Sequence, residues 1–327
     1  MRRLVLLAIV IVCAGVLSPV AVASGNPRPL GTFTVTSVVD ASCPAGYACR
    51  SFRIACPGVV QTVDGFLATG PPTGRVRGTV VVFSGARGTT WWSAKSPAWA
   101  QSLTDLRADG FQVVQVRWRN GWFASSSGDE AGASALACRP ATTLRWVHDH
   151  VYVPLGLPQP ALGRCGFCAL GWSSGSSAAV YAVTHYGLGS ILDAIVAVSG
   201  PVHGNIARGC AHLAGDEAFW YTSSARDQDA SYGFGRNGPC ALHDRTWRDR
   251  WLRDGIATSA IETGLDRTRV AAIIGNVDRG PAPAQSKAVT DLLISGGSPM
   301  VVVTKVLGMR HAPNAAGLAA MRAVLDA

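Results

Sequence analysis

From residue 79 onward, short apolar runs alternate along the chain with segments in which apolar residues recur at helical spacing. Continuous apolar runs are typical of strands buried on both faces of a parallel sheet, whereas a period of about 3.6 residues predicts helices with one face on the core. The runs predict strands at residues 79–83, 112–118, 164–170, 193–198, 269–274 and 300–307. The intervening segments predict helices at residues 97–108, 142–150, 174–186, 283–295 and 314–325.

Two segments that precede this alternation have a different pattern. Residues 32–40 and 49–68 are rich in β-branched and aromatic residues, alternate partially between apolar and polar positions, and are separated by turn-forming residues. Such segments are typical of antiparallel strands. We therefore expect antiparallel strands to open the chain.

Strands that alternate with helices require right-handed crossovers, so this order predicts an α/β fold with a mostly parallel central sheet flanked by helices. In such folds, ligands bind at the carboxyl ends of the strands. Residues 201–264 interrupt the alternation between the sixth and seventh strand regions, because they are rich in Gly, Arg, Asp and aromatic residues. We interpret this segment as a cap-like insertion.

The composition narrows the class of protein. The 327 residues are 48% hydrophobic and 15% charged, which supplies a large core and excludes a disordered, coiled-coil or collagen-like chain. Because no linker-like stretch divides residues 24–327, we expect a single domain there. The formal net charge is +9, but the basic residues are dispersed along the chain. This spread argues against a nucleic-acid partner.

The first residues have the order of an export signal. Two arginines are followed by an apolar run at residues 4–17 and by small residues at 21–23, which predicts a secretory signal peptide at residues 1–23. The apolar run is shorter than the roughly 20 residues that span a bilayer, so we favour export over a membrane anchor. A lipoprotein cysteine at Cys13 and twin-arginine export are minor alternatives. We therefore expect a secreted protein without a stable membrane anchor.

All cysteines except Cys13 follow this signal, and an even number in an exported chain indicates disulfide bonds. Many pairings are possible, and we favour Cys210 with Cys240, because they bracket a loop-rich segment without another cysteine. Cys165 and Cys168 have the spacing of a redox or metal motif. They lie in an apolar segment and no second such pair exists, so we favour a structural role and expect no metal.

The pentapeptide Gly-Trp-Ser-Ser-Gly at residues 171–175 has the form G-x-S-x-G. The pentapeptide alone is a weak signal, and a serine before a helix is most often an N-cap. Here it follows a predicted buried strand and opens a predicted helix of small residues, which is the setting of a nucleophile elbow. Larger side chains at positions 171 and 175 would collide with the neighbouring helix and strand. The pattern predicts that Ser173 exposes its hydroxyl above the sheet.

At these residues the chain resembles the α/β-hydrolase superfamily, and in particular its secreted serine esterases and lipases. The resemblance extends from about residue 79 to the C-terminus and implies the chain order nucleophile, acid, histidine. Asp278 follows the seventh predicted strand and His311 follows the last one, where the family carries its acid and its base. The resemblance therefore implies a catalytic triad of Ser173, Asp278 and His311.

Other residues compete for two of these roles. Asp266 and Asp291 are alternatives to Asp278, but the first precedes its strand and the second lies within a predicted helix. His203 is the main alternative to His311, because it follows the sixth predicted strand. The chain order of the family favours His311.

The resemblance also implies an oxyanion hole made of backbone N–H groups. One donor is expected to be the N–H of Ser174, which follows the nucleophile, and the other to come from the loop after the strand at 79–83. Ala86 is our candidate in that loop, with Gly85 beside it to allow a close approach. The loop departs from the common His-Gly motif of the family, because Ser84 stands in place of the histidine.

Aromatic residues cluster around the predicted site. Trp172 is next to the nucleophile, and Trp91 and Trp92 follow the oxyanion loop, so these three are candidates for the wall of a substrate pocket. Packing in the core is an equally good interpretation. The aromatic cluster at residues 219–221 also has two interpretations: it closes on a substrate, or it packs within the insertion.

The residues and the resemblance together predict a secreted serine hydrolase that cleaves a carboxylic ester of a small molecule, lipid or polymer through an acyl-enzyme, without a cofactor. An exported peptidase or acyltransferase with the same triad is the alternative enzyme. A non-catalytic binding protein is the alternative outside enzymes, because a fold alone does not establish a function.

Overall fold

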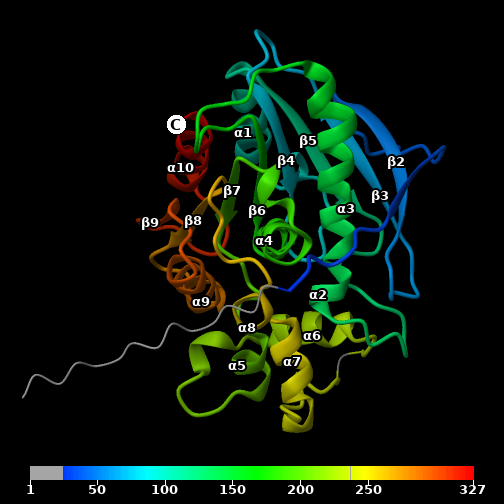
Figure 1. Cartoon of the computed structure of the whole chain (residues 1–327), viewed down its shortest axis with the longest axis vertical. Coiled ribbons are helices and arrows are strands. Elements are labelled where there is room, and N and C mark those ends of the chain that lie inside the picture. Colours follow the sequence, from blue (N-terminus) through cyan, green and yellow to red (C-terminus); the bar gives the residue numbers. More distant parts are fainter. Residues whose placement is uncertain (1–24, 236) are drawn as a thin grey trace, which may run out of the picture.

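The computed structural model describes residues 25–235 and 237–327, and the predicted signal peptide lies outside the described residues. The chain forms a nine-stranded sheet with helices on both faces (Figure 1). The strands are β1 (Thr32–Thr36), β2 (Ala48–Ala55), β3 (Val63–Gly70), β4 (Gly78–Phe83), β5 (Phe111–Trp118), β6 (Phe167–Trp172), β7 (Ala194–Val198), β8 (Arg269–Gly275) and β9 (Val301–Val306). The α-helices are α1 (Pro97–Ala108), α2 (Ala133–Leu136), α3 (Cys138–Val147), α4 (Ser174–Tyr186), α5 (Ile206–Ala211), α6 (Thr222–Ser231), α7 (Arg248–Asp254), α8 (Ile256–Ser259), α9 (Ala282–Ser295) and α10 (Ala315–Asp326).

The sheet has the strand order β1-β2-β3-β5-β4-β6-β7-β8-β9. Neighbours from β1 to β5 along this order are antiparallel, and all neighbours from β5 to β9 are parallel. The predicted fold class is confirmed. One boundary needs correction, because residues 49–68 form most of two strands: Pro57 and Gly58 turn the chain between β2 and β3.

The central strands are buried on both faces because successive side chains point to opposite sides of the sheet. On β4, Val80 and Val82 pack in a core with side chains of α1 and α10. Val81 and Phe83 pack on the other face with side chains of α3 and α4. Every residue of β4 is buried, which explains why the strand is a continuous apolar run rather than an alternating one.

Helix α3 begins earlier than predicted, at Cys138 instead of residue 142. The reason is Pro140, which breaks the interior of a helix but is tolerated in its first turn. A disulfide joins Cys138 to Cys56 at the end of β2. It fastens the start of the helix to the antiparallel part of the sheet.

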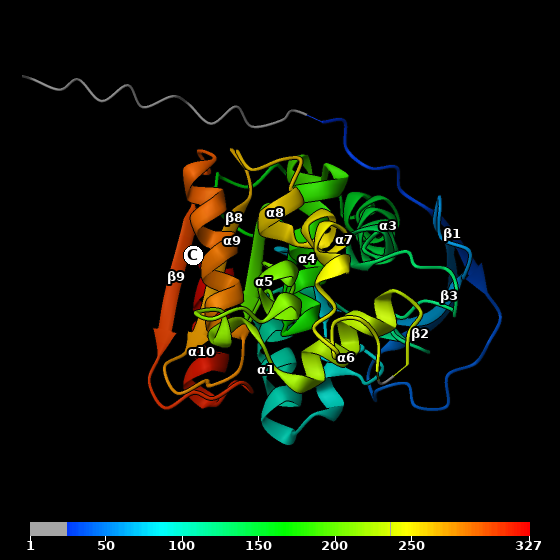
Figure 2. The same cartoon turned by 90° about the horizontal axis from the view of Figure 1, so that it is seen from below.

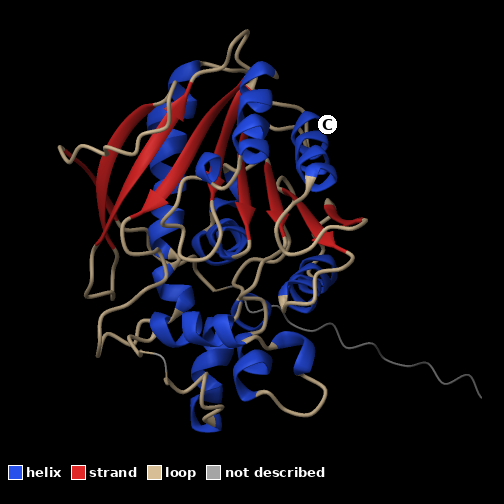
Figure 3. Cartoon of the chain, turned by 180° about the vertical axis from the view of Figure 1, so that it is seen from behind, coloured by secondary structure: helices blue, strands red, loops and turns tan. Residues whose placement is uncertain are grey.

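The inserted segment, residues 201–264, carries α5 to α8 and lies between β7 and β8. These helices gather at one end of the molecule in Figure 1, and the arrowheads of the parallel strands point toward them in Figure 3. Seen from below, α5, α6 and α7 lie in front of the sheet (Figure 2). The inserted segment therefore lies at the carboxyl edge of the parallel strands, where ligands bind in α/β folds.

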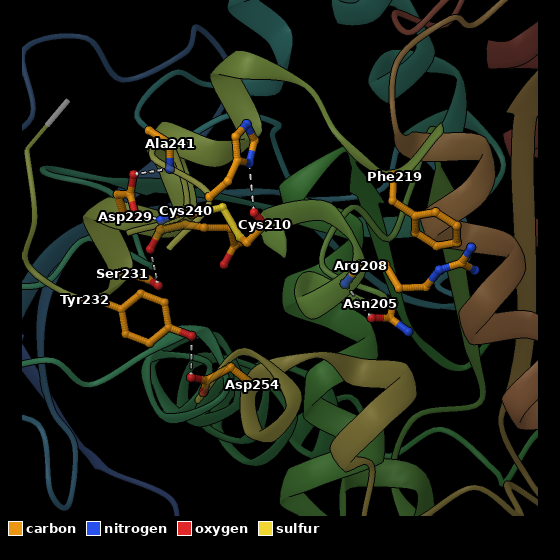
Figure 4. Close-up of a disulfide and its surroundings, with 12 residues drawn as sticks. Asn205, Arg208, Cys210, Phe219, Asp229, Ser231, Tyr232, Cys240, Ala241 and Asp254 are labelled. Atoms are coloured by element: carbon orange, nitrogen blue, oxygen red, sulfur yellow. Dashed lines mark hydrogen bonds between the residues drawn. A yellow bond between two sulfur atoms is a disulfide. The ribbon is translucent and has the colours of Figure 1, made fainter. Parts of the chain in front are cut away.

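The inserted segment is held together by the predicted Cys210–Cys240 disulfide, whose cysteines are 30 residues apart (Figure 4). Beside it, the carboxylate of Asp229 on α6 accepts hydrogen bonds from the N–H groups of Cys240 and Ala241, at 2.7 and 2.9 Å. These contacts join α5 and α6 to the loop before α7. Buried polar bonds of this kind favour one packing of the helices.

The other cysteines of the described chain also form disulfides. Cys43 pairs with Cys49, and Cys165 pairs with Cys168 at the amino end of β6, away from the carboxyl edge. Within residues 25–235 and 237–327, no group of three or more His, Cys, Asp or Glu residues is placed to hold a metal ion. In the same residues, no helix has both the length and the apolar character that a bilayer span requires.

Candidate active site

Ser173 occupies a sharp turn between β6 and α4. Its backbone has φ +56° and ψ −120°, a conformation that costs a residue with a side chain about 1–3 kcal/mol. Its N–H donates a hydrogen bond to the carbonyl of Val198 at 2.8 Å. A Cβ atom at Gly171 would collide with the backbone of Gly175, and one at Gly175 would collide with the backbone of Phe83. Glycine at both positions is therefore what allows this turn to form.

Three loops at the carboxyl edge of the sheet bring Ser173, His311 and Asp278 together. Nε2 of His311 lies 2.9 Å from Oγ of Ser173, and Nδ1 of His311 lies 3.0 Å from Oδ2 of Asp278. These residues follow β6, β9 and β8, so the site depends on the parallel order of the strands. The structure thus joins all three residues of the predicted triad in one chain of hydrogen bonds.

The Asp278 side chain is almost completely buried, with 2% of its surface exposed. Burial alone raises the pKa of a carboxyl group, but hydrogen bonds from His311 and from the N–H of Gly280 outweigh it and hold the pKa of Asp278 below its ordinary value. The carboxylate therefore stays ionised near neutral pH. An ionised carboxylate holds Nδ1 of His311 in its protonated form and leaves Nε2 free to accept a proton.

The histidine side chain is more accessible, with 39% of its surface exposed. The indole N–H of Trp172 donates a hydrogen bond to the carbonyl of His311 at 2.7 Å. Because Trp172 directly precedes Ser173, this bond links the two loops that carry Ser173 and His311.

Ala86 and Ser174 both line the cleft beside Ser173. Ser174 is the first residue of α4, so its N–H has no acceptor within the helix. Ala86 has a left-handed φ of +53°, and its carbonyl accepts a hydrogen bond from the Ser174 hydroxyl. The structure thus joins the two loops that carry the predicted oxyanion donors.

Ser84 does not face the reaction site. It is buried, and its hydroxyl donates a hydrogen bond to the carbonyl of Thr90 at 2.6 Å. The N–H of Gly88 donates to the carbonyl of Gly85 at 3.1 Å. These two bonds fold the loop that carries Ala86, so the serine in place of the family's histidine has a structural role here.

Ser173, Asp278 and His311 line a cleft with a volume of about 440 Å³. Its remaining walls come from the loop that carries Ala86, from Trp172, from the loop after β8 and from the inserted segment. The inserted segment contributes Val202, His203, Tyr221, Ser223, Ser224 and Asp227. A cleft of this size accommodates a small organic molecule.

Two of the three tryptophans proposed for the pocket wall do not reach the cleft. Trp91 is 3% exposed and Trp92 is 1% exposed, and neither lines it. The side chain of Trp92 packs against Trp99 of α1, with ring centroids 4.5 Å apart, and Trp91 packs against Phe66 and Ala68 of β3. The prediction for these two residues is corrected, because the chain turns back onto the core after the oxyanion loop. Trp172 does line the cleft.

The alternatives to the predicted base and acid are placed differently from His311 and Asp278. His203 also lines the cleft, but it is buried and packs against Trp122 and Phe123, at ring-centroid distances of 5.9 and 5.5 Å. Burial lowers its pKa to about 3, so it is neutral in the folded protein. Asp266 is exposed before β8, and Asp291 forms a 2.6 Å ion pair with Lys287 on α9.

Sequence reasoning missed most of the cleft wall that comes from the inserted segment. Ser223, Ser224 and Asp227 are polar residues of α6 without a motif that marks them. The aromatic cluster at 219–221 was a partial signal, because Tyr221 lines the cleft while Phe219 is buried away from it. Arg279, next to the triad aspartate, also lines the cleft.

No protein-family model matches the sequence, and the search of curated proteins finds no match either. Solved structures do match. An esterase from Pyrobaculum calidifontis aligns with a TM-score of 0.53 and 16% identity, over 85% of this chain and 83% of that one. Brefeldin A esterase, described as a bacterial homologue of human hormone-sensitive lipase, aligns with a TM-score of 0.53 and 16% identity, over 89% and 78%.

A puromycin-hydrolysing peptidase from Mycobacterium tuberculosis aligns with a TM-score of 0.47 and 15% identity. The alignment covers 88% of this chain but only 39% of the peptidase, so this chain spans about two fifths of that protein. At such identities the similarity extends to the fold and not to the activity. The sheet order, the elbow and the similarity to the two esterase structures show that the chain has the α/β-hydrolase fold.

Proposed function

We propose that this protein is a serine hydrolase that cleaves carboxylic esters through an acyl-enzyme. The observation that carries the proposal is the hydrogen-bond chain from Ser173 through His311 to the buried Asp278, which opens onto a cleft. A serine hydroxyl is a poor nucleophile at neutral pH and needs a base within hydrogen-bond reach. Nε2 of His311 is such a base.

In the first half of the reaction, Oγ of Ser173 attacks the ester carbonyl while His311 takes the hydroxyl proton. The tetrahedral oxyanion accepts hydrogen bonds from the N–H groups of Ser174 and Ala86. When the intermediate collapses, His311 gives its proton to the leaving alcohol and the acyl group stays on Ser173. In the second half, His311 activates a water molecule that releases the acid and restores the serine.

The disulfides and the inserted segment support an exported enzyme with a cap. Four disulfides within the described residues fit an oxidising compartment, as does the signal-like pattern at residues 1–23. The inserted segment supplies one wall of the cleft, so we propose that it serves as the cap of a single domain spanning residues 24–327. The two similar structures are esterases, which favours an ester over an amide.

The test is a pre-steady-state assay with p-nitrophenyl acetate. The proposal predicts a burst of p-nitrophenol that matches the enzyme concentration, followed by slower turnover, because the acyl group accumulates on Ser173. Ser173→Ala should abolish both phases while its circular dichroism spectrum is unchanged. Turnover that persists in Ser173→Ala would refute the proposal.

The same assay separates the alternatives. A matched p-nitroanilide tests for an amidase, and added acceptor alcohols test for an acyltransferase. Ester hydrolysis that exceeds both reactions supports the esterase. A folded protein without any turnover would favour a binding protein instead.

A further inference from the structure

The cleft contains a carboxylate, that of Asp227, which the proposed chemistry does not use. Asp227 lies on α6 of the inserted segment and lines the same cleft as Ser173 and His311. Its side chain is 28% exposed. A carboxylate in such a position loses much of its hydration and needs a partner within the protein or the ligand.

The protein supplies only a weak partner for this carboxylate. Among the described residues, its one ion pair is with Arg87, whose Nε lies 3.8 Å from Oδ1 of Asp227. This distance is too long for a hydrogen bond. Arg87 is itself 52% exposed, so water screens its charge. Burial raises the pKa of Asp227 above its ordinary value although Arg87 lowers it, which agrees with a poorly compensated charge.

The other ionisable groups of the cleft do not cancel this charge. Asp278 is hydrogen-bonded to His311. The buried His203 is neutral, because burial lowers its pKa to about 3. Arg279 forms no ion pair among the described residues, but it is exposed, so water screens its positive charge. Asp227 is therefore the less hydrated of the two charges that face the cleft without a close partner.

Other residues that line the cleft suit a positively charged group. Tyr221, which directly precedes α6, lines the cleft and is 53% exposed. Aromatic faces attract cations, and quaternary ammonium groups bind well where aromatic rings and a carboxylate meet. The hydroxyls of Ser223 and Ser224 add acceptors for a protonated amine.

We propose that the cleft takes esters that carry a protonated or quaternary amine, and that Asp227 binds this cation while Ser173 attacks the ester. Asp227 is a specificity residue and takes no part in bond breaking. This inference rests on the proposed function, because the cation belongs to the ester that Ser173 cleaves.

The experiment compares two pairs of esters that differ only in charge. Choline butyrate is paired with 3,3-dimethylbutyl butyrate, and p-nitrophenyl 4-(trimethylammonio)butanoate is paired with p-nitrophenyl 5,5-dimethylhexanoate. The first pair places the cation on the alcohol and the second places it on the acyl group. We expect kcat/KM for the cationic member to be higher by about tenfold or more in at least one pair, which is the change that roughly 1.4 kcal/mol produces.

Two variants should move this preference in opposite directions. Asp227→Asn should reduce it to less than about twofold, because the carboxylate that binds the cation is removed. Arg87→Gln should increase it, because the competing cation is removed. If the only role of the Asp227–Arg87 ion pair were to hold α6 against the oxyanion loop, both variants would lower activity on all four esters equally. Asp291→Asn, on the surface of α9, is the matched control and should keep the preference of the wild type.

Binding of choline, measured by calorimetry, tests the cation site independently of catalysis. Binding by the wild type that is lost in Asp227→Asn supports the site even if no ester is cleaved, in which case only the proposed function fails. Equal hydrolysis of both members of each pair, or absence of choline binding, overturns the cation site and leaves the proposed function standing.

Discussion

At the scale of single residues, the side chains of the proposed site are held in place by their neighbours. Ser173 and Ala86 both have positive φ angles, and each is fixed by hydrogen bonds or close contacts around it. The side chain of Asp278 is buried and hydrogen-bonded to His311 and Gly280. If the site is catalytic as proposed, these fixed positions require little rearrangement when charge develops on the substrate.

The proposed role of Asp278 as the acid can be tested by removing its charge. Asp278→Asn should lower kcat/KM for p-nitrophenyl esters by about a thousandfold or more, because an amide N–H₂ facing Nδ1 favours the wrong tautomer of His311. The measurement is steady-state kinetics with a circular dichroism spectrum to check the fold. Asp266→Asn, at an exposed position before β8 and thus at the other end of this strand from Asp278, is the control and should remain within about twofold of wild type. Similar losses in both variants would contradict the assigned role of Asp278.

The family resemblance and the local pattern were sufficient to predict that Ser173, Asp278 and His311 lie together, because each follows a strand of a parallel sheet. The sequence left Trp91 and Trp92 undecided between the pocket wall and the core. An indole fits a pocket wall and a core equally well, and only the path of the chain after the oxyanion loop decides between them.

At the scale of elements, the inserted segment determines one wall of the cleft. Helix α6 is mostly polar and has no N-cap side-chain bond, so its position depends on tertiary contacts rather than on its own propensity. The Cys210–Cys240 disulfide and the hydrogen bonds of Asp229 supply those contacts (Figure 4). The position of Asp227 in the cleft therefore depends on this disulfide.

The dependence of α6 on the Cys210–Cys240 disulfide can be tested by removing the disulfide. Replacing Cys210 and Cys240 with serine should lower the free energy of unfolding by about 3–4 kcal/mol, the loop-closure value for 30 residues. It should also raise KM for small esters, because α6 loses its fixed position. Unfolding by guanidinium chloride and ester kinetics are the measurements.

The matched control is the double serine variant of Cys43 and Cys49, a disulfide that lies in the antiparallel part of the sheet. It should leave KM unchanged. If both double variants changed KM equally, the inserted segment would not depend on its own disulfide.

Element boundaries show where local sequence is insufficient. The Pro57-Gly58 turn divided one predicted strand region into β2 and β3, and Pro140 lies inside the first turn of α3 rather than before the helix. The position of α6 in the wall of the cleft was not predictable, because a short polar helix has the same sequence pattern whether it faces a cleft or bulk water.

At the scale of the whole molecule, buried histidines connect stability to pH. Burial lowers the pKa of both His185 and His203 from 6.5 to about 3. Between these values the unfolded chain binds protons that the folded chain does not. The contribution of each histidine to the free energy of unfolding is therefore fully present above pH 6.5. It decreases by about 1.4 kcal/mol per pH unit as the pH falls toward 3.

This slope can be tested with His185→Gln, because glutamine also offers hydrogen bonds to Thr184 and Ser259, the partners of His185. Denaturant unfolding at several pH values should show a smaller loss of stability on acidification in the variant than in the wild type. Buried acids with raised pKa values, such as Asp254, oppose the trend in both proteins, so they cancel in the difference. Parallel curves for the two proteins would contradict a neutral His185.

The fold as a whole was predictable because the alternation of strands and helices is set by burial on both faces of the sheet. How the inserted segment packs on the carboxyl edge was not, because its packing also depends on buried polar bonds, such as those of Asp229, that no sequence pattern marks.

The proposed nucleophile can be tested by labelling the disulfide-intact protein with a fluorophosphonate probe, followed by peptide mapping, with Ser173→Ala as the control. We expect one label per chain, on Ser173, and none in the variant, because only a serine activated by His311 attacks the phosphonate. A folded protein that takes up no label, or equal labelling of Ser173→Ala, would show that Ser173 is not the activated nucleophile.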